Sequence, residues 1–196
     1  LQYTMDHEGS VAPVNARRVY DRYGHYVIPR IRGTFALHQL RLMMGNTAFL
    51  TLMRSVHDRY KSKTMSTAQF LDAVQAAGGA GPAAAVRQWL MRDDLPVPVA
   101  SATVAQAGEA WTLRVRVQQS GTPYTFTSSV AIETAGDTEW RPVVVTGPDQ
   151  EFLFTTKKKP LRVVFNPGND IPVRRENNAI YGNLFDDFST AQIVYG

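Results

Sequence analysis

The residues of this chain that could carry chemistry are few and scattered. A zinc-binding H-E-x-x-H motif places two imidazoles on one face of a helix, with a glutamate between them as general base. The four histidines, His7, His25, His38 and His57, contain no pair at that spacing, and the dipeptide His7-Glu8 has no second histidine after it. There is no cysteine and no G-x-S-x-G nucleophile turn. The sequence therefore predicts no metal ligand, no cofactor-binding residue and no complete catalytic site in this chain.

Other polar or aromatic candidates have simpler interpretations. His38 lies in a helical pattern, where a packed or surface histidine is more usual than a ligand, because a metal would need further ligands from elsewhere. His57-Asp58-Arg59 is typical of a charged helix face. Asp93-Asp94 could suggest paired carboxylates, but it follows a helix end and precedes a proline linker, so we expect a solvated turn. Trp89 could be a substrate platform, but its spacing from Val86 favours the core.

The charge balance favours neither a nucleic acid nor a membrane as partner. The net charge is +4, and the densest basic runs are Lys157-Lys158-Lys159 and Arg174-Arg175. Neither run is interleaved with stacking aromatics, so both are expected to be solvated loop charge. No apolar run approaches the roughly 18–20 residues of a membrane span. An apolar fraction of 44% with 19% charged residues is typical of a globular chain.

A helical apolar pattern begins just after Gly33 and ends just before Gly45-Asn46. Its members repeat at three- and four-residue steps and are Phe35, Ala36, Leu40, Met43 and Met44. This period predicts a helix with one buried face, ended by residues that accept a left-handed backbone conformation.

The residues before this helix, 1–32, are expected to be irregular. Pro13 and Pro29 bias the residues before them away from helix. Within this stretch, residues 17–23 could form a short helix with Asn15 as its cap.

Three further helical patterns follow, over residues 47–60, 66–77 and 83–92. Thr47 is a plausible cap for the first of them, and Gly78-Gly79 terminates the second. The four segments predict a short antiparallel helical subdomain.

The hydrophobic period changes to two after the proline-containing linker 93–98. Trp111, Leu113, Val115 and Val117 alternate with polar residues, as in a half-buried strand. Similar runs are predicted near 99–104, 124–132, 140–145, 152–155, 161–165 and 192–195, separated by turn residues. We therefore predict an α+β multidomain chain, in which residues 1–96 are helical and residues 97–196 form an immunoglobulin-like β-sandwich.

The helical half resembles the gluzincin aminopeptidases, the family of aminopeptidase N and leukotriene hydrolase. Arg32-Gly33 and the run through Arg41 are similar to the segment Y-x-K-G-x-x-x-L-x-x-L-R that follows the zinc site in that family. Four further similarities occur in the family's order, at Gly45-Asn46-Thr47-Ala48-Phe49, Ser66-Thr67-Ala68-Gln69-Phe70, Ala77-Gly78-Gly79, and Gln88-Trp89-Leu90 before Leu95-Pro96. The series covers residues 30–98, and the β-sandwich resembles the family's next domain more loosely.

The resemblance implies that residues 1–96 are the C-terminal half of a thermolysin-like catalytic domain. Peptide hydrolysis and zinc would then belong to the full-length protein, and the main partner of this chain would be the missing N-terminal catalytic segment. Two residues before its Lys/Arg-Gly pair, the family has a tyrosine that stabilises the oxyanion, and this chain has Arg30 there. A guanidinium is longer and permanently charged, so we expect that the catalytic role is lost.

Two alternatives remain open at this point. Arg30 in place of tyrosine is consistent with a non-catalytic interaction or scaffold module derived from the family, with a peptide or protein partner. The polar face of the strand that carries Arg114 and Arg116, together with the long connection 166–190, is consistent with an independent domain that binds carbohydrate or protein. Glu176-Asn177-Asn178 is a possible binding loop in that connection.

Overall fold

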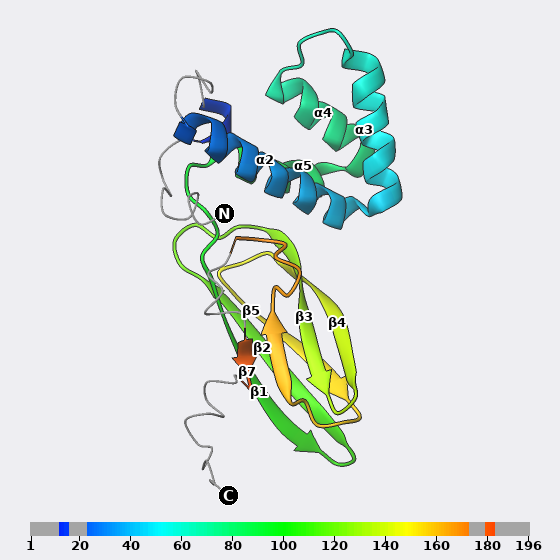
Figure 1. Cartoon of the computed structure of the whole chain (residues 1–196), viewed down its shortest axis with the longest axis vertical. Helices are drawn as coiled ribbons and strands as arrows, with labels where there is room; N and C mark the ends of the chain where they lie inside the picture. Colours follow the sequence, from blue (N-terminus) through cyan, green and yellow to red (C-terminus); the bar gives the residue numbers. More distant parts are fainter. Residues whose placement is uncertain (1–11, 16–22, 173–178, 183–196) are drawn as a thin grey trace, which may run out of the picture. The chain divides into compact units, whose positions relative to one another are not determined.

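The computed structural model describes residues 12–15, 23–172 and 179–182 (Figure 1). A 3-10 helix, η1 (Pro13–Asn15), precedes four helices, which are α2 (Tyr23–Met44), α3 (Asn46–Tyr60), α4 (Thr67–Gly78) and α5 (Ala80–Met91). Seven strands follow: β1 (Pro98–Ala107), β2 (Ala110–Gln119), β3 (Phe126–Thr134), β4 (Asp137–Val145), β5 (Asp149–Thr156), β6 (Arg162–Phe165) and β7 (Ala179–Tyr181). The predicted α+β class, a helical subdomain followed by a sandwich-like domain, is confirmed.

The chain divides into two compact units. Unit 1 contains Leu1–Pro96 together with Tyr124–Thr127, and unit 2 contains Val97–Pro123 and Ser128–Gly196. The short segment Tyr124–Thr127 thus groups with the helices, although it follows the first two strands in the sequence. Among the described residues, no helix is both long enough and apolar enough to cross a membrane.

Helix α2 begins earlier than predicted, at Tyr23. The prediction of an irregular segment up to residue 32 was therefore wrong, because the helix continues through Pro29 and Gly33. A proline inside a helix removes one backbone hydrogen bond. One turn after it, however, the Arg32 side chain bonds to backbone carbonyl groups outside the helix, which fixes this part of α2 in place.

The short helix predicted over residues 17–23 lies outside the described residues, except that Tyr23 begins α2. Asn15 ends η1 and is not the N-cap of α2. The later helices agree more closely with the prediction. Helix α4 begins after a capping box, in which the Gln69 amide donates to Ser66 Oγ at 3.2 Å and the Ser66 amide donates to Gln69 Oε1 at 2.9 Å. Thr47 is not the cap of α3, because Gly45, at a φ of 78°, occupies that position.

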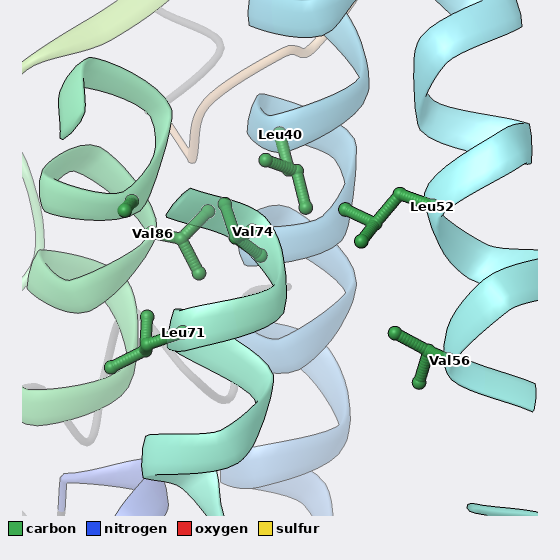
Figure 2. Packing of buried hydrophobic residues seen from close by; sticks show 7 residues of the cluster. Leu40, Leu52, Val56, Leu71, Val74 and Val86 are labelled. Carbon is green, nitrogen blue, oxygen red and sulfur yellow. The ribbon is translucent and has the colours of Figure 1, made fainter. Parts of the chain in front are cut away.

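The core of the helical unit lies where α2, α3, α4 and α5 meet. Figure 2 shows six of its side chains, which are Leu40, Leu52, Val56, Leu71, Val74 and Val86. Of the five residues of the predicted apolar face, Ala36 and Leu40 are buried, whereas Phe35, Met43 and Met44 are half-buried. The helical period therefore predicted which face of α2 packs into the core, but not how deeply each residue of that face is buried.

Unit 2 contains two antiparallel sheets, of order β1-β2-β5 and β4-β3-β6-β7. In β2, Leu113, Val115 and Val117 are fully buried whereas Arg114 and Arg116 are exposed, which confirms the predicted alternation. The sequence suggested one long connection over residues 166–190, but part of it forms strand β7, which pairs with β6. The strand predicted near 192–195 and the loop Glu176-Asn177-Asn178 lie outside the described residues.

Candidate functional site

Two arginines on α2 have different environments. Arg30, for which the resemblance predicts the position of an oxyanion tyrosine, has an exposed side chain, and its carbonyl accepts a hydrogen bond from Thr34 Oγ1 at 2.8 Å. Arg32 is only 2% exposed, although arginine is rarely buried without partners. The buried arginine, and not the exposed one, is therefore the centre of the polar cluster of the helical unit.

The Arg32 guanidinium binds three consecutive carbonyl groups that follow α5. Its Nη1 donates to the Asp93 oxygen at 2.8 Å, and its Nη2 donates to the oxygens of Arg92 and Asp94, each at 2.6 Å. The Arg92 carbonyl belongs to the C-cap of α5, where carbonyl groups lack partners within the helix, and those of Asp93 and Asp94 lie just beyond it. Arg32 thus supplies hydrogen-bond donors to the backbone carbonyl groups at the point where the chain leaves α5.

Asp94 is fixed by two side chains from different parts of unit 1. Arg92 Nε donates to Asp94 Oδ1 at 2.7 Å, and Arg92 Nη2 pairs with the other carboxylate oxygen. The Tyr124 hydroxyl donates to the Asp94 carbonyl at 2.8 Å, and the Arg92 guanidinium lies 3.8 Å from the centre of the tyrosine ring. The predicted solvated turn is confirmed for Asp93, which is exposed, whereas the Asp94 side chain is 43% exposed and also holds fixed partners.

The electrostatics of this cluster favour a fixed structure over proton transfer. Burial lowers the pKa of Arg32, opposed by the negative charge of Asp94. Burial by itself would raise the pKa of Asp94, but the hydrogen bond from Arg92 and its charge outweigh burial, so the pKa is below its usual value. Burial and the Asp94 charge raise the pKa of Tyr124. At neutral pH the carboxylate is ionised and the phenol keeps its proton, so neither acts as a general acid or base of ordinary strength.

Trp89 stands behind this polar cluster and is fully buried. Its ring stacks on Phe35, with centroids 5.9 Å apart and planes 22° apart, and it lies 5.3 Å from the ring of Tyr124. The prediction that Trp89 belongs to the core and is not an exposed substrate platform is confirmed. Its indole nitrogen has no hydrogen-bond partner among the described residues.

Two glutamine side chains bind the backbone of the segment Tyr124–Thr127. Gln39 is fully buried; its Oε1 accepts from the Thr127 amide at 2.8 Å and its Nε2 donates to the Thr127 carbonyl at 2.9 Å. Gln88 Oε1 accepts from the Thr125 amide at 3.0 Å. The sequence analysis missed both roles, and the one available signal was that Gln39 directly precedes Leu40 on the buried side of α2.

The remaining site candidates do not converge. His38 is half-buried and His57 is exposed on α3, as expected for a charged face. His25 lies on α2 without a described side chain, and His7 falls outside the described residues. In the part of the chain that the structure describes, no three His, Cys, Asp or Glu side chains are grouped to hold a metal. The described residues therefore do not fit a zinc ion.

The basic residues singled out in the sequence are exposed or paired. Arg114 Nη1 donates to Glu151 at 2.7 Å, and Arg116 Nε donates to Asp149 at 2.8 Å. Lys158 donates to the Ala135 carbonyl at 2.9 Å, while Arg174-Arg175 lies outside the described residues. The face of β2 that carries Arg114 and Arg116 therefore presents ion pairs, not a free cationic stripe.

One open groove lies within the helical unit. It has a volume of about 370 Å³ and is lined by residues from all four helices, among them Leu37, Met53, Phe70 and Leu90, and by Met65 from the connection between α3 and α4. Leu37, at 36% exposed, contributes to an accessible apolar rim. Its lining is mainly apolar, and of its two hydroxyl-bearing residues, Ser66 and Thr67, the former is engaged in capping α4.

Comparisons with known proteins give a likeness in fold. No protein-family model matches the chain, and no curated protein matches it. The solved structure of aminopeptidase A from Legionella pneumophila, in complex with aspartic acid, is similar with a TM-score of 0.58 and 9% identity. The match covers 78% of this chain, which spans 18% of the length of that aminopeptidase. At this identity the likeness shows a shared fold alone.

Proposed function

We propose that this chain is the C-terminal part of a zinc metallopeptidase similar to aminopeptidase N and is not catalytic on its own. Residues 1–96 would be the C-terminal half of a thermolysin-like catalytic domain, and residues 97–196 an immunoglobulin-like domain. Peptide hydrolysis would belong to the full-length protein, whose zinc ligands lie outside this chain.

One observation carries the proposal. Three residues of the motif series, Arg32, Gln88 and Trp89, meet in a single cluster of unit 1, where they bind or pack against Asp94 and Tyr124–Thr127. Residues that are far apart in the sequence and match a family's pattern are expected to share a structural task. The likeness of the fold to an aminopeptidase gives independent support.

The architecture of unit 2 agrees with the immunoglobulin-like assignment. Its described residues form seven antiparallel strands, arranged as one three-stranded and one four-stranded sheet. Strands of this number and sheet organisation within about 100 residues are typical of immunoglobulin-like sandwiches.

The apolar groove of the helical unit supports a partner within the same protein. A contiguous exposed apolar surface usually marks a contact site. Under this proposal the groove around Leu37 and Phe70 would contact the missing N-terminal catalytic segment.

The test uses the full-length natural product that contains this chain, with residues 1–196 alone as the control. We expect the full-length protein to bind about one zinc ion and to release the N-terminal residue of aminoacyl-coumarin substrates in a chelator-sensitive way. Residues 1–196 are expected to do neither. Hydrolysis by residues 1–196, or a full-length product without a metal-binding motif upstream, would contradict the proposal.

A non-catalytic scaffold derived from the same family is the second candidate, and Arg30 favours it. Removing one oxyanion donor from an active enzyme lowers kcat by roughly 10²–10³. If the full-length protein is active, Arg30→Ala is expected to change its kcat less than about threefold, because the arginine has lost the tyrosine's role. A zinc-free full-length protein without peptidase activity would favour the scaffold.

A further inference from the structure

The outer face of the sheet β4-β3-β6 carries a second groove, unrelated to the peptidase assignment. It lies wholly within unit 2 and has a volume of about 460 Å³, within the usual range of small-molecule sites. In each of the three strands every second side chain points to this face of the sheet. Trp140, Glu133 and Arg162 are among these side chains, and they line the groove together. No residue of this groove belongs to the motif series or to the Arg32 cluster.

An exposed tryptophan dominates the groove. Trp140 is 56% exposed, whereas Trp89 is fully buried. Beside it, the floor consists of Ala131 and Val164, which are paired across β3 and β6 and are both buried. A flat aromatic ring beside small apolar side chains offers a surface for the C–H face of a sugar ring or for another flat apolar group.

Polar groups stand next to this apolar surface. Arg162 Nη1 donates to Glu133 Oε1 at 2.8 Å, and the two residues are directly opposite in the register of β3 and β6. The Nε of Arg162 is buried and has no hydrogen-bond partner among the described residues. Thr138 adds a hydroxyl group to the lining, and Asn169 adds an amide.

The loop that carries Asn169 is held in place from behind. The buried Asn166 donates through Nδ2 to the Ile171 carbonyl at 2.8 Å, and its Oδ1 accepts from Ser128 Oγ at 3.2 Å. The Asn166 amide also donates to the Ser129 carbonyl at 2.9 Å. This rim of the groove is therefore preorganised, which reduces the entropy lost when a ligand binds.

The charges in the lining favour a neutral ligand that both donates and accepts hydrogen bonds. Glu133 and Arg162 neutralise each other, so an anionic or cationic ligand would have to compete with their ion pair. A polyol can donate to the carboxylate and accept from the guanidinium at the same time, while its C–H face covers the indole. We propose that this groove is a binding site for a neutral saccharide of one or two rings, with Trp140 as the stacking platform.

The experiment titrates the intact chain with maltose, cellobiose, lactose and N,N′-diacetylchitobiose, and follows the tryptophan indole N–H signals by NMR. We expect at least one disaccharide to shift the Trp140 signal in a saturable way, with a Kd of about 1 mM or below. The signals of Trp89 and Trp111 are expected to stay in place. Each tryptophan gives a separate indole N–H signal, so the wild-type titration alone shows which tryptophan the sugar contacts. The site is therefore localised even if a variant fails to fold.

Three variants sharpen the result. Trp140→Ala is expected to weaken binding at least about tenfold, and Thr138→Val about two- to fivefold, because each removes one part of the lining. Trp111→Phe, which changes a tryptophan outside the groove, is the matched control and is expected to bind normally.

Four outcomes would overturn the proposal. They are no saturation with any of the four sugars at about 20 mM, unchanged binding by Trp140→Ala, a response only to glucuronate, which is titrated in parallel as an anionic sugar, and a Trp140 signal that moves on dilution of the protein without sugar. The third outcome would assign the groove to an acidic ligand, and the fourth would assign it to a second copy of the chain.

Discussion

Replacing Arg32 tests whether one buried guanidinium holds the end of α5. Arg32→Met keeps most of the volume and the apolar stem of the side chain but removes the donors to the carbonyl oxygens of Arg92, Asp93 and Asp94. An unsatisfied buried acceptor costs about 1–3 kcal/mol, and hydrogen bonds from a charged donor are at the upper end of the usual range.

The net loss is smaller than the sum of three such bonds. Burial of the guanidinium is itself unfavourable, as the lowered pKa of Arg32 indicates, and the methionine avoids that cost. Solvent also reaches part of the exposed turn at Asp93 after the change. We therefore expect Arg32→Met to lower the free energy of unfolding of the helical unit by about 3 kcal/mol. Arg32→Lys, which keeps the charge but lacks the planar fork, is expected to lower it by about 1.5 kcal/mol.

Urea unfolding followed by circular dichroism at 222 nm measures this effect, because the described helices all belong to unit 1. Arg87→Met is the matched control, since Arg87 is exposed on α5, and we expect a change below about 0.5 kcal/mol. If Arg32→Met and Arg87→Met unfolded at the same urea concentration with the same slope, the stabilising role of the three hydrogen bonds would be refuted.

Three further predictions concern the same unit. Because the pKa of Asp94 is lowered in the folded state, its carboxylate contributes stability above the ordinary carboxyl pKa of about 3.9, and this stability is lost as the pH falls through the folded-state pKa. The difference in urea midpoint between wild type and Asp94→Asn should therefore shrink on acidification from about pH 5 to 3. A difference independent of pH, or equal to that of the exposed Asp93→Asn, would contradict this. Gln39→Leu removes the two hydrogen bonds to Thr127 and should cost about 2 kcal/mol in the same assay. Gln39→Glu keeps an acceptor but buries a carboxylate against the Thr127 carbonyl, and should cost at least as much. A smaller loss for Gln39→Glu than for Gln39→Leu would argue against the paired bonding. Gly79→Ala should lower the free energy of unfolding by about 1–2 kcal/mol, because φ is 83° at this position. Gly81→Ala should be neutral or stabilising, because its φ is not positive and an added methyl group meets open space. A stabilised Gly79→Ala would refute the reasoning.

The sequence by itself was sufficient wherever the decisive interactions are local. The helical pattern over residues 66–77 was enough to locate α4, and the alternation of Leu113, Val115 and Val117 follows from strand geometry alone. The order of four helices followed by strands could also be predicted, because the spacing of apolar residues within each segment indicates whether it is a helix or a strand.

The boundaries and caps failed where a local rule was overridden by distant contacts. Pro29 and Gly33 suggested that α2 begins later than it does, since each disfavours a helix on local grounds. Asp94 was expected to be solvated because its neighbours are charged and a proline follows. Its ion pair with Arg92 is local, but its second partner, Tyr124, lies 30 residues further along the chain, so no local pattern could have indicated that contact.

Only the tertiary structure showed which polar residues are buried and why. Arg32 bonds to carbonyl groups about 60 residues away, and Gln39 bonds to Thr127, 88 residues away. Burying a guanidinium or an amide is unfavourable unless its hydrogen-bond partners are in place, and these partners exist only after the chain has folded. Residue type and spacing could therefore locate the helices and strands, whereas the polar cluster around Arg32 and the groove beside Trp140 depend on segments that meet only in three dimensions.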